Sequence, residues 1–173
     1  MKKFFELVLP GVARVNGVFI VIEKTWLVIL MVGMLVFGFL QVFSRYVLKA
    51  PIDWSEELLT YSFAWASFVG ASLAIHTKSH FSVDLLVRIF PHDVRKAVEV
   101  FTWSLVLLFS IFLIIMGWIL TMANRIQMMN VLPLSMVWAY LAMPVSGVFI
   151  LSHTAQILME IILDINRVEA QES

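Results

Sequence analysis

The chain has 173 residues, of which 61% are hydrophobic and 14% charged, and its formal charges cancel. Its mean hydropathy of +0.95 excludes an ordinary soluble domain and indicates an integral membrane protein. Without a basic excess there is no reason to expect a nucleic-acid partner, and without cysteine there is neither a disulfide framework nor a thiolate metal site.

The first 24 residues begin with two lysines but contain no uninterrupted apolar run. Glu6, Pro10 and Arg14 divide the stretch, so a cleaved signal peptide is not expected. The apolar side chains recur at helical spacing on one broad face, which is typical of a helix that lies in the cytoplasmic interface of a membrane. We therefore predict an interfacial amphipathic helix over residues 1–24. The alternative is an extension of the first membrane span.

Four later stretches supply the roughly 20 apolar residues that a helix needs to cross a hydrocarbon core of about 30 Å. The predicted spans are residues 25–45, 54–75, 98–122 and 135–163. The last is long enough to tilt or to project from the membrane. Pro144 inside it removes one backbone donor and should bend the helix.

The loop between the second and third spans contains a further amphipathic segment. Apolar and charged residues alternate over residues 81–90 before Pro91, which predicts a short interfacial helix. No internal repeat or low-complexity segment is present, so residues 1–173 are read as a single domain. The predicted fold is an all-α, integral membrane four-helix bundle with an N-terminal interfacial helix and a second one in the cytoplasmic loop.

The distribution of Lys and Arg predicts the orientation of this bundle. Nine of the twelve lie in the N-terminal segment, the loop between the second and third spans, and the C-terminal tail. The two hairpins on the other side hold the remaining three. Because cytoplasmic loops carry the excess of basic residues, both termini are expected in the cytoplasm.

The second span is introduced by an acidic segment with the sequence DWSEE, residues 53–57. Asp53 precedes Glu56 by three residues, the spacing of a helix-capping pair, and acids at this end are favoured by the helix dipole. Arg45, at the end of the preceding span, could neutralise one of them across the hairpin. A purely structural role is one interpretation, and an outward-facing polar surface that docks a partner protein is the other.

A stripe of small side chains follows along the same span at steps of four and three residues. Small residues let a second helix approach closely, which is how membrane helices associate. Whether that helix belongs to this chain or to another subunit is left open. The candidate partner-interface residues are Arg45, Asp53, Trp54, Glu56, Glu57, Thr60, Ala64, Ser67 and Ala71, and Ala74 extends the stripe.

Histidines are the remaining candidates for chemistry. His76, His80 and His92 have spacings that fit a metal site, but no cysteine and no obvious fourth ligand accompany them. We therefore predict no metal and no cofactor in this chain. His153 lies inside the fourth span near Gln156, where hydrogen bonding within the bundle is its expected role.

The predicted spans have no Asp, Glu, Lys or Arg near their centres, and a single interior proline. A transporter that couples to ions through its own core usually needs such charges or broken helices. We therefore expect neither solute transport by this chain alone nor enzymatic activity. A self-sufficient exporter would need an acid embedded in the membrane. A haem-carrying anchor of a respiratory enzyme would need paired histidines, and only His153 lies within a span.

Six short motifs stand out from Gln41 onward: QVFSRY (41–46), PIDWSEEL (51–58), FAW (63–65), GA (70–71), HFSVD (80–84) and YLAMPV (140–145). Together they resemble the small membrane subunit, of the DctQ-like type, of tripartite ATP-independent periplasmic (TRAP) transporters, and the likeness covers most of the chain from Gln41 onward. The chain departs from the family at Thr60, where a basic residue is common, and at Ala50, where asparagine often stands.

This resemblance implies a scaffold subunit in the bacterial inner membrane. In such a transporter a periplasmic binding protein delivers an organic anion, and a large, DctM-like membrane subunit holds the substrate and sodium sites. The small subunit would then anchor the large one in the lipid bilayer. The family transports carboxylates such as C4-dicarboxylates and sialic acids, and no residue in this chain selects among them.

Overall fold

The computed structural model describes residues 2–77 and 92–172 of the chain. It contains four long helices, α1 (Lys2–Phe43), α2 (Asp53–His76), α4 (His92–Ala123) and α6 (Ala142–Glu172), together with a short π-helix, η1 (Ser44–Leu48), and the single turn α5 (Val137–Tyr140). Each long helix contains a stretch that is long and apolar enough to cross a membrane. The predicted all-α membrane bundle is therefore confirmed. The predicted interfacial helix at residues 81–90 lies outside the described residues.

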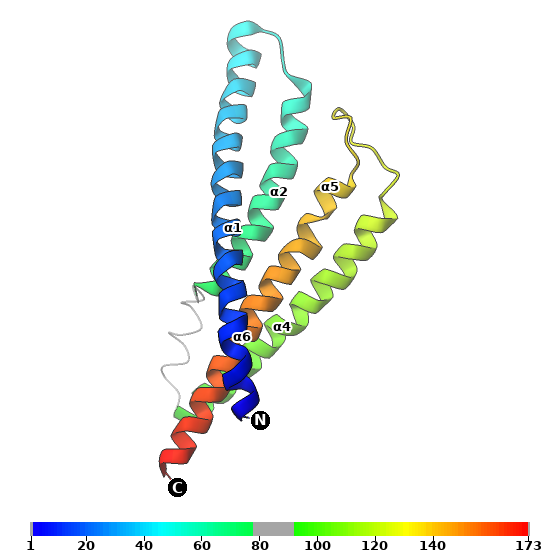
Figure 1. The fold of residues 1–173 in the computed structure, drawn as a ribbon. Helices are drawn as coiled ribbons and strands as arrows, with labels where there is room; N and C mark the ends of the chain where they lie inside the picture. Colours follow the sequence, from blue (N-terminus) through cyan, green and yellow to red (C-terminus); the bar gives the residue numbers. More distant parts are fainter. Residues whose placement is uncertain (1, 78–91, 173) are drawn as a thin grey trace.

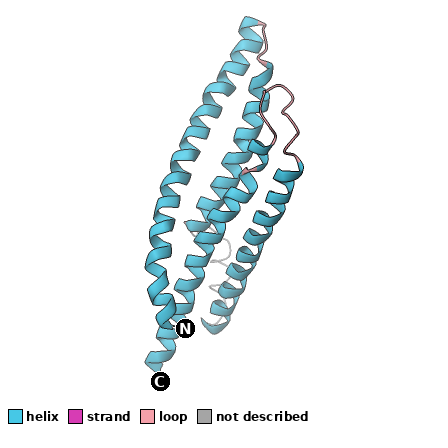
Figure 2. Ribbon diagram, turned by 45° about the vertical axis from the view of Figure 1, so that its right-hand side comes forward, coloured by secondary structure: helices cyan, strands magenta, loops and turns pink. Residues whose placement is uncertain are grey.

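The helices are arranged as two antiparallel hairpins (Figures 1 and 2). Helices α1 and α2 form one, α4 and α6 the other, and both termini lie at the same end of the bundle. Helix α6 contacts α1, α2 and α4, so it is the central element. A small apolar core joins three of the helices near the terminal end; it consists of Ile75, Trp103, Ile150 and Ile157.

Helix α1 is continuous across the boundary that the sequence predicted at residues 24 and 25. At 1.5 Å per residue its 42 residues extend about 63 Å, twice the thickness of a hydrocarbon core. The helix must therefore tilt or project beyond the membrane. The N-terminal segment is helical and continuous with the first predicted span, and its residues Asn16 and Glu23 hydrogen-bond to α6. Its position relative to the membrane interface stays a prediction.

The first hairpin turn follows a local widening of the helix. In η1 the hydroxyl of Ser44 donates to the carbonyl of Ala50, and the amide of Ala50 donates back to the carbonyl of Ser44 at 3.2 Å. Lys49 ends this segment in the left-handed region, with φ 51°. These contacts close the turn, so that the chain enters α2 directly after Pro51.

The fourth predicted span lacks one helical hydrogen bond near its start. Helix α5 ends at Tyr140 and α6 begins at Ala142. Pro144 has no amide hydrogen to donate to the carbonyl of Tyr140, so one helical hydrogen bond is missing there, whereas Leu141 keeps helical backbone angles of φ −58° and ψ −20°. Pro144 itself lies in the first turn of α6, where its missing donor is tolerated.

Two glycines allow α4 and α6 to approach closely. A methyl group added at Gly117 would lie 2.8 Å from both Met143 Cβ and Pro144 Cδ, and one added at Gly147 would lie 2.9 Å from Ile114 Cγ1. Neither position has room for a side chain. The contact between the two helices therefore depends on both glycines.

Substitution of these glycines should separate the second hairpin. We expect Gly117→Ala and Gly147→Ala each to destabilise the full chain by about 1–3 kcal/mol, the usual range for overpacking. Gly33→Ala is the matched control, because nothing lies within 4 Å of a methyl group there. Thermal unfolding in detergent checks this, and equal melting temperatures for all three variants would contradict it.

Candidate functional sites

The sequence-predicted acidic segment lies at the end of the bundle opposite the termini. Arg45 in η1 lies 3.9 Å from Glu56 in α2, Nη2 to Oε2, which confirms the predicted pairing across the hairpin. The two side chains are 54% and 73% exposed, so the pair contributes little to stability. Both groups remain accessible to a partner.

The predicted helix cap at Asp53 is wrong. The residue in the cap position is Ile52, which has no side-chain capping bond, and Asp53 is the first residue of α2. Ser55, in the first turn, donates its hydroxyl to the carbonyl of Ile52 at 2.7 Å and caps no amide. Asp53 and Glu56 still lie in the first turn, where the helix dipole favours negative charge.

Glu57 has a role within the chain that the sequence did not reveal. Its Oε1 accepts the backbone amide of Asn130 at 2.8 Å, and its Oε2 accepts those of Val131 and Leu132 at 2.8 and 2.9 Å. The hydroxyl of Tyr61 lies 3.5 Å from Oε1. One carboxylate in α2 thus holds the loop between α4 and α5 against the first hairpin.

Removal of the Glu57 carboxylate should release this loop. We expect the amides of residues 130–132 to exchange with deuterium about tenfold faster in Glu57→Ala, because three backbone donors lose their carboxylate acceptor together. Glu57→Gln retains one oxygen and should give an intermediate rate. Glu56→Gln is the control, and an equal effect there would argue against the loop contact. Hydrogen exchange read by mass spectrometry makes the measurement.

These acids also line a shallow groove of about 320 Å³ at the same end of the bundle. Three carboxylates, one phenol and the backbone of the α4–α5 loop meet there. The lining residues are Asp53, Glu56, Glu57, Thr60, Tyr61, Asn130 and Val131. Trp54, beside the groove, is 41% exposed and packs edge-on against Phe37 of α1.

The small-residue stripe of α2 faces away from the other helices. Thr60, Ser67, Ala71 and Ala74 are exposed, and Ala64 is half-buried. The hydroxyls of Thr60 and Ser67 donate to backbone carbonyls one turn earlier, at 2.9 and 2.8 Å. The stripe therefore presents a smooth surface on the outside of the bundle, and it is not covered by a described helix of this chain.

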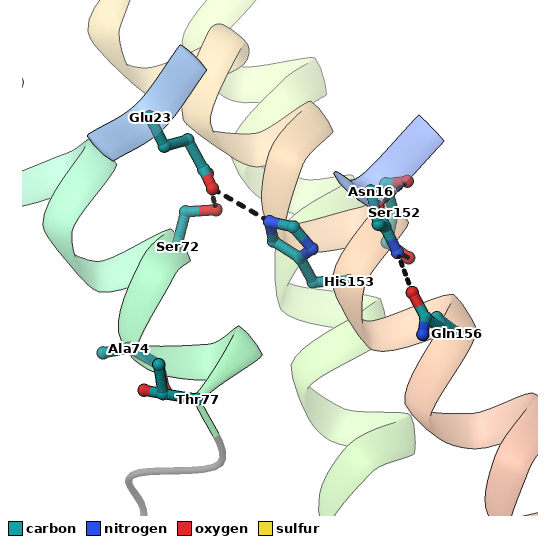
Figure 3. A network of polar contacts seen from close by, with 8 residues as sticks. All are labelled: Asn16, Glu23, Ser72, Ala74, Thr77, Ser152, His153 and Gln156. Atoms are coloured by element: carbon teal, nitrogen blue, oxygen red, sulfur yellow. Dashed lines mark hydrogen bonds and ion pairs between the residues drawn. The ribbon is translucent and has the colours of Figure 1, made fainter. Parts of the chain in front are cut away.

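A buried polar cluster joins three helices in the terminal half of the bundle (Figure 3). The Oε1 of Glu23 in α1 accepts the hydroxyl of Ser72 in α2 at 2.5 Å, and its Oε2 lies 3.0 Å from Nε2 of His153 in α6. All three side chains are buried. The predicted hydrogen bonding of His153 within the bundle is confirmed. No described residue pairs with its Nδ1, so Nε2 alone anchors the ring.

Asn16 forms a second polar contact between α1 and α6. Its amide nitrogen donates to the carbonyl of Ser152 at 3.1 Å and to Oε1 of Gln156 at 2.6 Å, while the hydroxyl of Ser152 donates to Oδ1 of Asn16 at 2.6 Å. Asn16 is 1% exposed. Its side-chain oxygen and nitrogen are thus both satisfied across the helix contact.

Glu23 is a buried acid that the sequence did not single out, and it lies two residues before the first predicted span, residues 25–45. The candidate span in α1 extends over Leu7–Leu48, and Glu23 lies within it. The sequence placed this acid in the predicted interfacial helix, residues 1–24, directly before Lys24. Its one sequence signal was the distance of seven residues from Asn16, which places both side chains on one face of a helix.

The histidines do not form a metal centre in the described part of the chain. The rings of His76 and His153 lie 5.1 Å apart, but no group of three or more His, Cys, Asp or Glu in residues 7–77 and 97–163 could hold a metal ion. His80 and the side chain of His92 lie outside what the structure describes.

Four apolar helices, with their polar contacts made between helices and at the ends, define a multi-pass membrane protein. Comparison with known families identifies the family to which this membrane protein belongs. The chain belongs to the DctQ component family of the tripartite ATP-independent periplasmic transporters, whose sequence profile matches residues 34–164. This family is a transporter component and not an enzyme. Membership also supports location in a bacterial inner membrane.

Individual relatives carry the same description. The chain is 32% identical over 119 residues to the sialic acid TRAP transporter permease protein SiaT of Haemophilus influenzae, which covers 67% of this chain and 19% of that protein. It is 34% identical over 97 residues to the C4-dicarboxylate TRAP transporter small permease protein DctQ of Vibrio cholerae, covering 56% and 42%. It is 30% identical over 129 residues to the sialic acid TRAP transporter small permease protein SiaQ of Vibrio cholerae, covering 74% of each.

The first two of these matches span less than half of the relative's own length. In SiaT the matched segment is about a fifth of the permease protein. A segment similar to this chain is therefore found both as a small permease protein and as part of a much larger polypeptide.

Proposed function

We propose that this chain is the small scaffold subunit of a sodium-coupled, binding-protein-dependent TRAP transporter for organic anions. It anchors a large membrane subunit in the bacterial inner membrane, with both termini in the cytoplasm. The transported anion is a carboxylate such as a C4-dicarboxylate or sialic acid. The observation that carries this proposal is membership of the DctQ component family, with relatives named for both substrates.

The buried chemistry of the chain supports a scaffold rather than a carrier. Glu23 is the buried acid among residues 7–77 and 97–163, and both of its oxygens are engaged by Ser72 and His153. A coupling site for sodium needs oxygen ligands that are available to the ion. We therefore assign the sodium and substrate sites to the large subunit.

The match to SiaT supports the identity of the partner. Because the similar segment is a minor part of that permease protein, the remaining four fifths are the natural counterpart of a separate large subunit. The proposed contact surfaces here are the exposed stripe of α2 and the acidic end of the bundle with Arg45. The periplasmic binding protein is the third component.

The test is co-expression of the full chain with the large multi-span protein encoded beside it. The scaffold proposal expects the two to co-purify. It also expects sodium-driven uptake of an organic acid into liposomes only when both subunits and the binding protein are present. Accumulation of the acid by this chain alone would contradict the proposal. A haem absorption band in the purified chain would instead favour an anchor of a respiratory enzyme.

A further inference from the structure

We propose that the two buried polar side chains of α1, Asn16 and Glu23, fix the register of this helix on α6 and α2. The inference concerns how the chain holds its own longest helix, and it does not depend on the transported substrate or on the partner subunit.

Apolar packing gives α1 little positional information. Only 6% of its membrane-spanning window is buried within the chain. Large apolar side chains such as Val28, Leu35 and Phe39 are 61%, 75% and 68% exposed. Lipid imposes no hydrophobic penalty on exposed apolar side chains. The exposed residues of α1 therefore do not distinguish one axial position of the helix from another one turn away.

The polar side chains supply the missing information. Asn16 and Glu23 are seven residues apart, so both lie on the face of α1 that contacts the bundle. Phe19, between them on this face, packs against Phe149 of α6 with ring centroids 5.0 Å apart. The contact thus alternates polar, aromatic and polar layers. Buried polar residues at heptad spacing are a well-attested means of specifying register in helical assemblies.

Both polar layers are selective for one position. A slip of one turn moves α1 by about 5.4 Å along its axis. Oε1 and Oε2 of Glu23 would then leave Ser72 and His153, with which they form contacts of 2.5 and 3.0 Å. Asn16 would lose Ser152 and Gln156 in the same movement. A carboxylate without partners inside the bundle is strongly unfavourable, which disfavours every slipped arrangement.

The absence of cysteine from the chain makes the register directly measurable. A Phe19→Cys/Phe149→Cys pair reports the native register. Val15→Cys/Phe149→Cys and Ile22→Cys/Phe149→Cys report slips of one turn in either direction, because Val15 and Ile22 lie about one turn on either side of residue 19. Each pair is introduced into the full chain and crosslinked in membrane vesicles with a short thiol-specific reagent.

The polar layers are then removed with N16L/E23L/H153L, which replaces both polar side chains of α1 and the histidine partner of Glu23 by leucine. We expect the native crosslink to fall, and one slip crosslink to rise, by about threefold or more relative to the unaltered background, as loss of several interhelical hydrogen bonds implies. Thr25→Val is the matched control, because the Thr25 hydroxyl donates within α1 to the carbonyl of Val21.

A crosslinking pattern in the triple variant equal to that of the control would overturn the proposal. If the triple variant fails to accumulate in membranes, N16L is tested alone, because it leaves Glu23 and His153 in place. The direction of the expected change is the same. The slip crosslink should then rise about twofold, in proportion to the fewer bonds lost. An unchanged pattern in N16L would overturn the proposal equally.

Discussion

Replacement of His153 by leucine is expected to destabilise the bundle by about 3–5 kcal/mol, because it leaves the buried Glu23 carboxylate without its main partner. Glu23→Leu should cost less, about 1–3 kcal/mol, since it leaves a buried imidazole with one unmade hydrogen bond. The double variant E23L/H153L should recover most of the loss, because a buried pair is often replaced by apolar residues at little cost. Unfolding of the full chain in mixed micelles gives the three free energies.

The informative quantity in this double-mutant cycle is the coupling free energy between Glu23 and His153. Losses that simply add in the double variant would show that Glu23 and His153 do not stabilise each other, contrary to their 3.0 Å contact. Thr25→Val again serves as the control, since it removes a hydroxyl from α1 without touching α6. The free energy of unfolding and the helix register are measured separately. The double variant is expected to regain stability but not the native register of α1.

The membrane fold could be predicted from the sequence because it depends on local composition. A helix that crosses lipid must satisfy its own backbone and present apolar side chains over its whole length, so the number and approximate limits of the spans follow from hydropathy. Pro144 could be interpreted in the same way, since a missing donor acts within one turn. In the structure the effect stays local, because the helical backbone continues through Leu141.

The functional contacts could not be predicted in this way because their partners are remote in the chain. Glu23 and His153 are 130 residues apart, and the carboxylate of Glu57 meets amides 73 to 75 residues away. From local patterns, Glu23 was assigned to the membrane interface and Glu57 to a partner-binding surface. The capping prediction failed for a related reason, since the spacing of Asp53 and Glu56 fits a cap although Ile52 occupies the cap position.

Two neighbouring side chains of α1 show why the predicted and observed positions of Glu23 differ. Lys24 follows Glu23 directly, and a charged pair usually marks the water boundary of a span. Helix α1 nevertheless continues through both residues, with Glu23 buried and Lys24 exposed. One face of a helix can enter a bundle while the next residue lies outside it, so a charge beside the boundary does not reveal which side of the helix it occupies.

Ala71→Trp is the second change expected to have a large effect, and it acts on assembly rather than on the chain itself. Ala71 is an exposed member of the α2 stripe, so an indole there should leave the bundle intact. If the stripe receives a helix of the large membrane subunit, the close approach that small residues permit is lost. We expect the yield of co-purified complex to fall by about tenfold or more, equivalent to about 1.4 kcal/mol or more in binding.

The control for this change is Leu108→Trp on the outer side of α4, where the native side chain is already large and 67% exposed. Both variants should give the same melting temperature for the isolated chain in detergent. Only Ala71→Trp should reduce the complex and sodium-driven uptake. An equal loss in both variants would indicate a general effect of added bulk in the membrane, and retention of the complex by Ala71→Trp would assign the contact to a face of the bundle other than the α2 stripe.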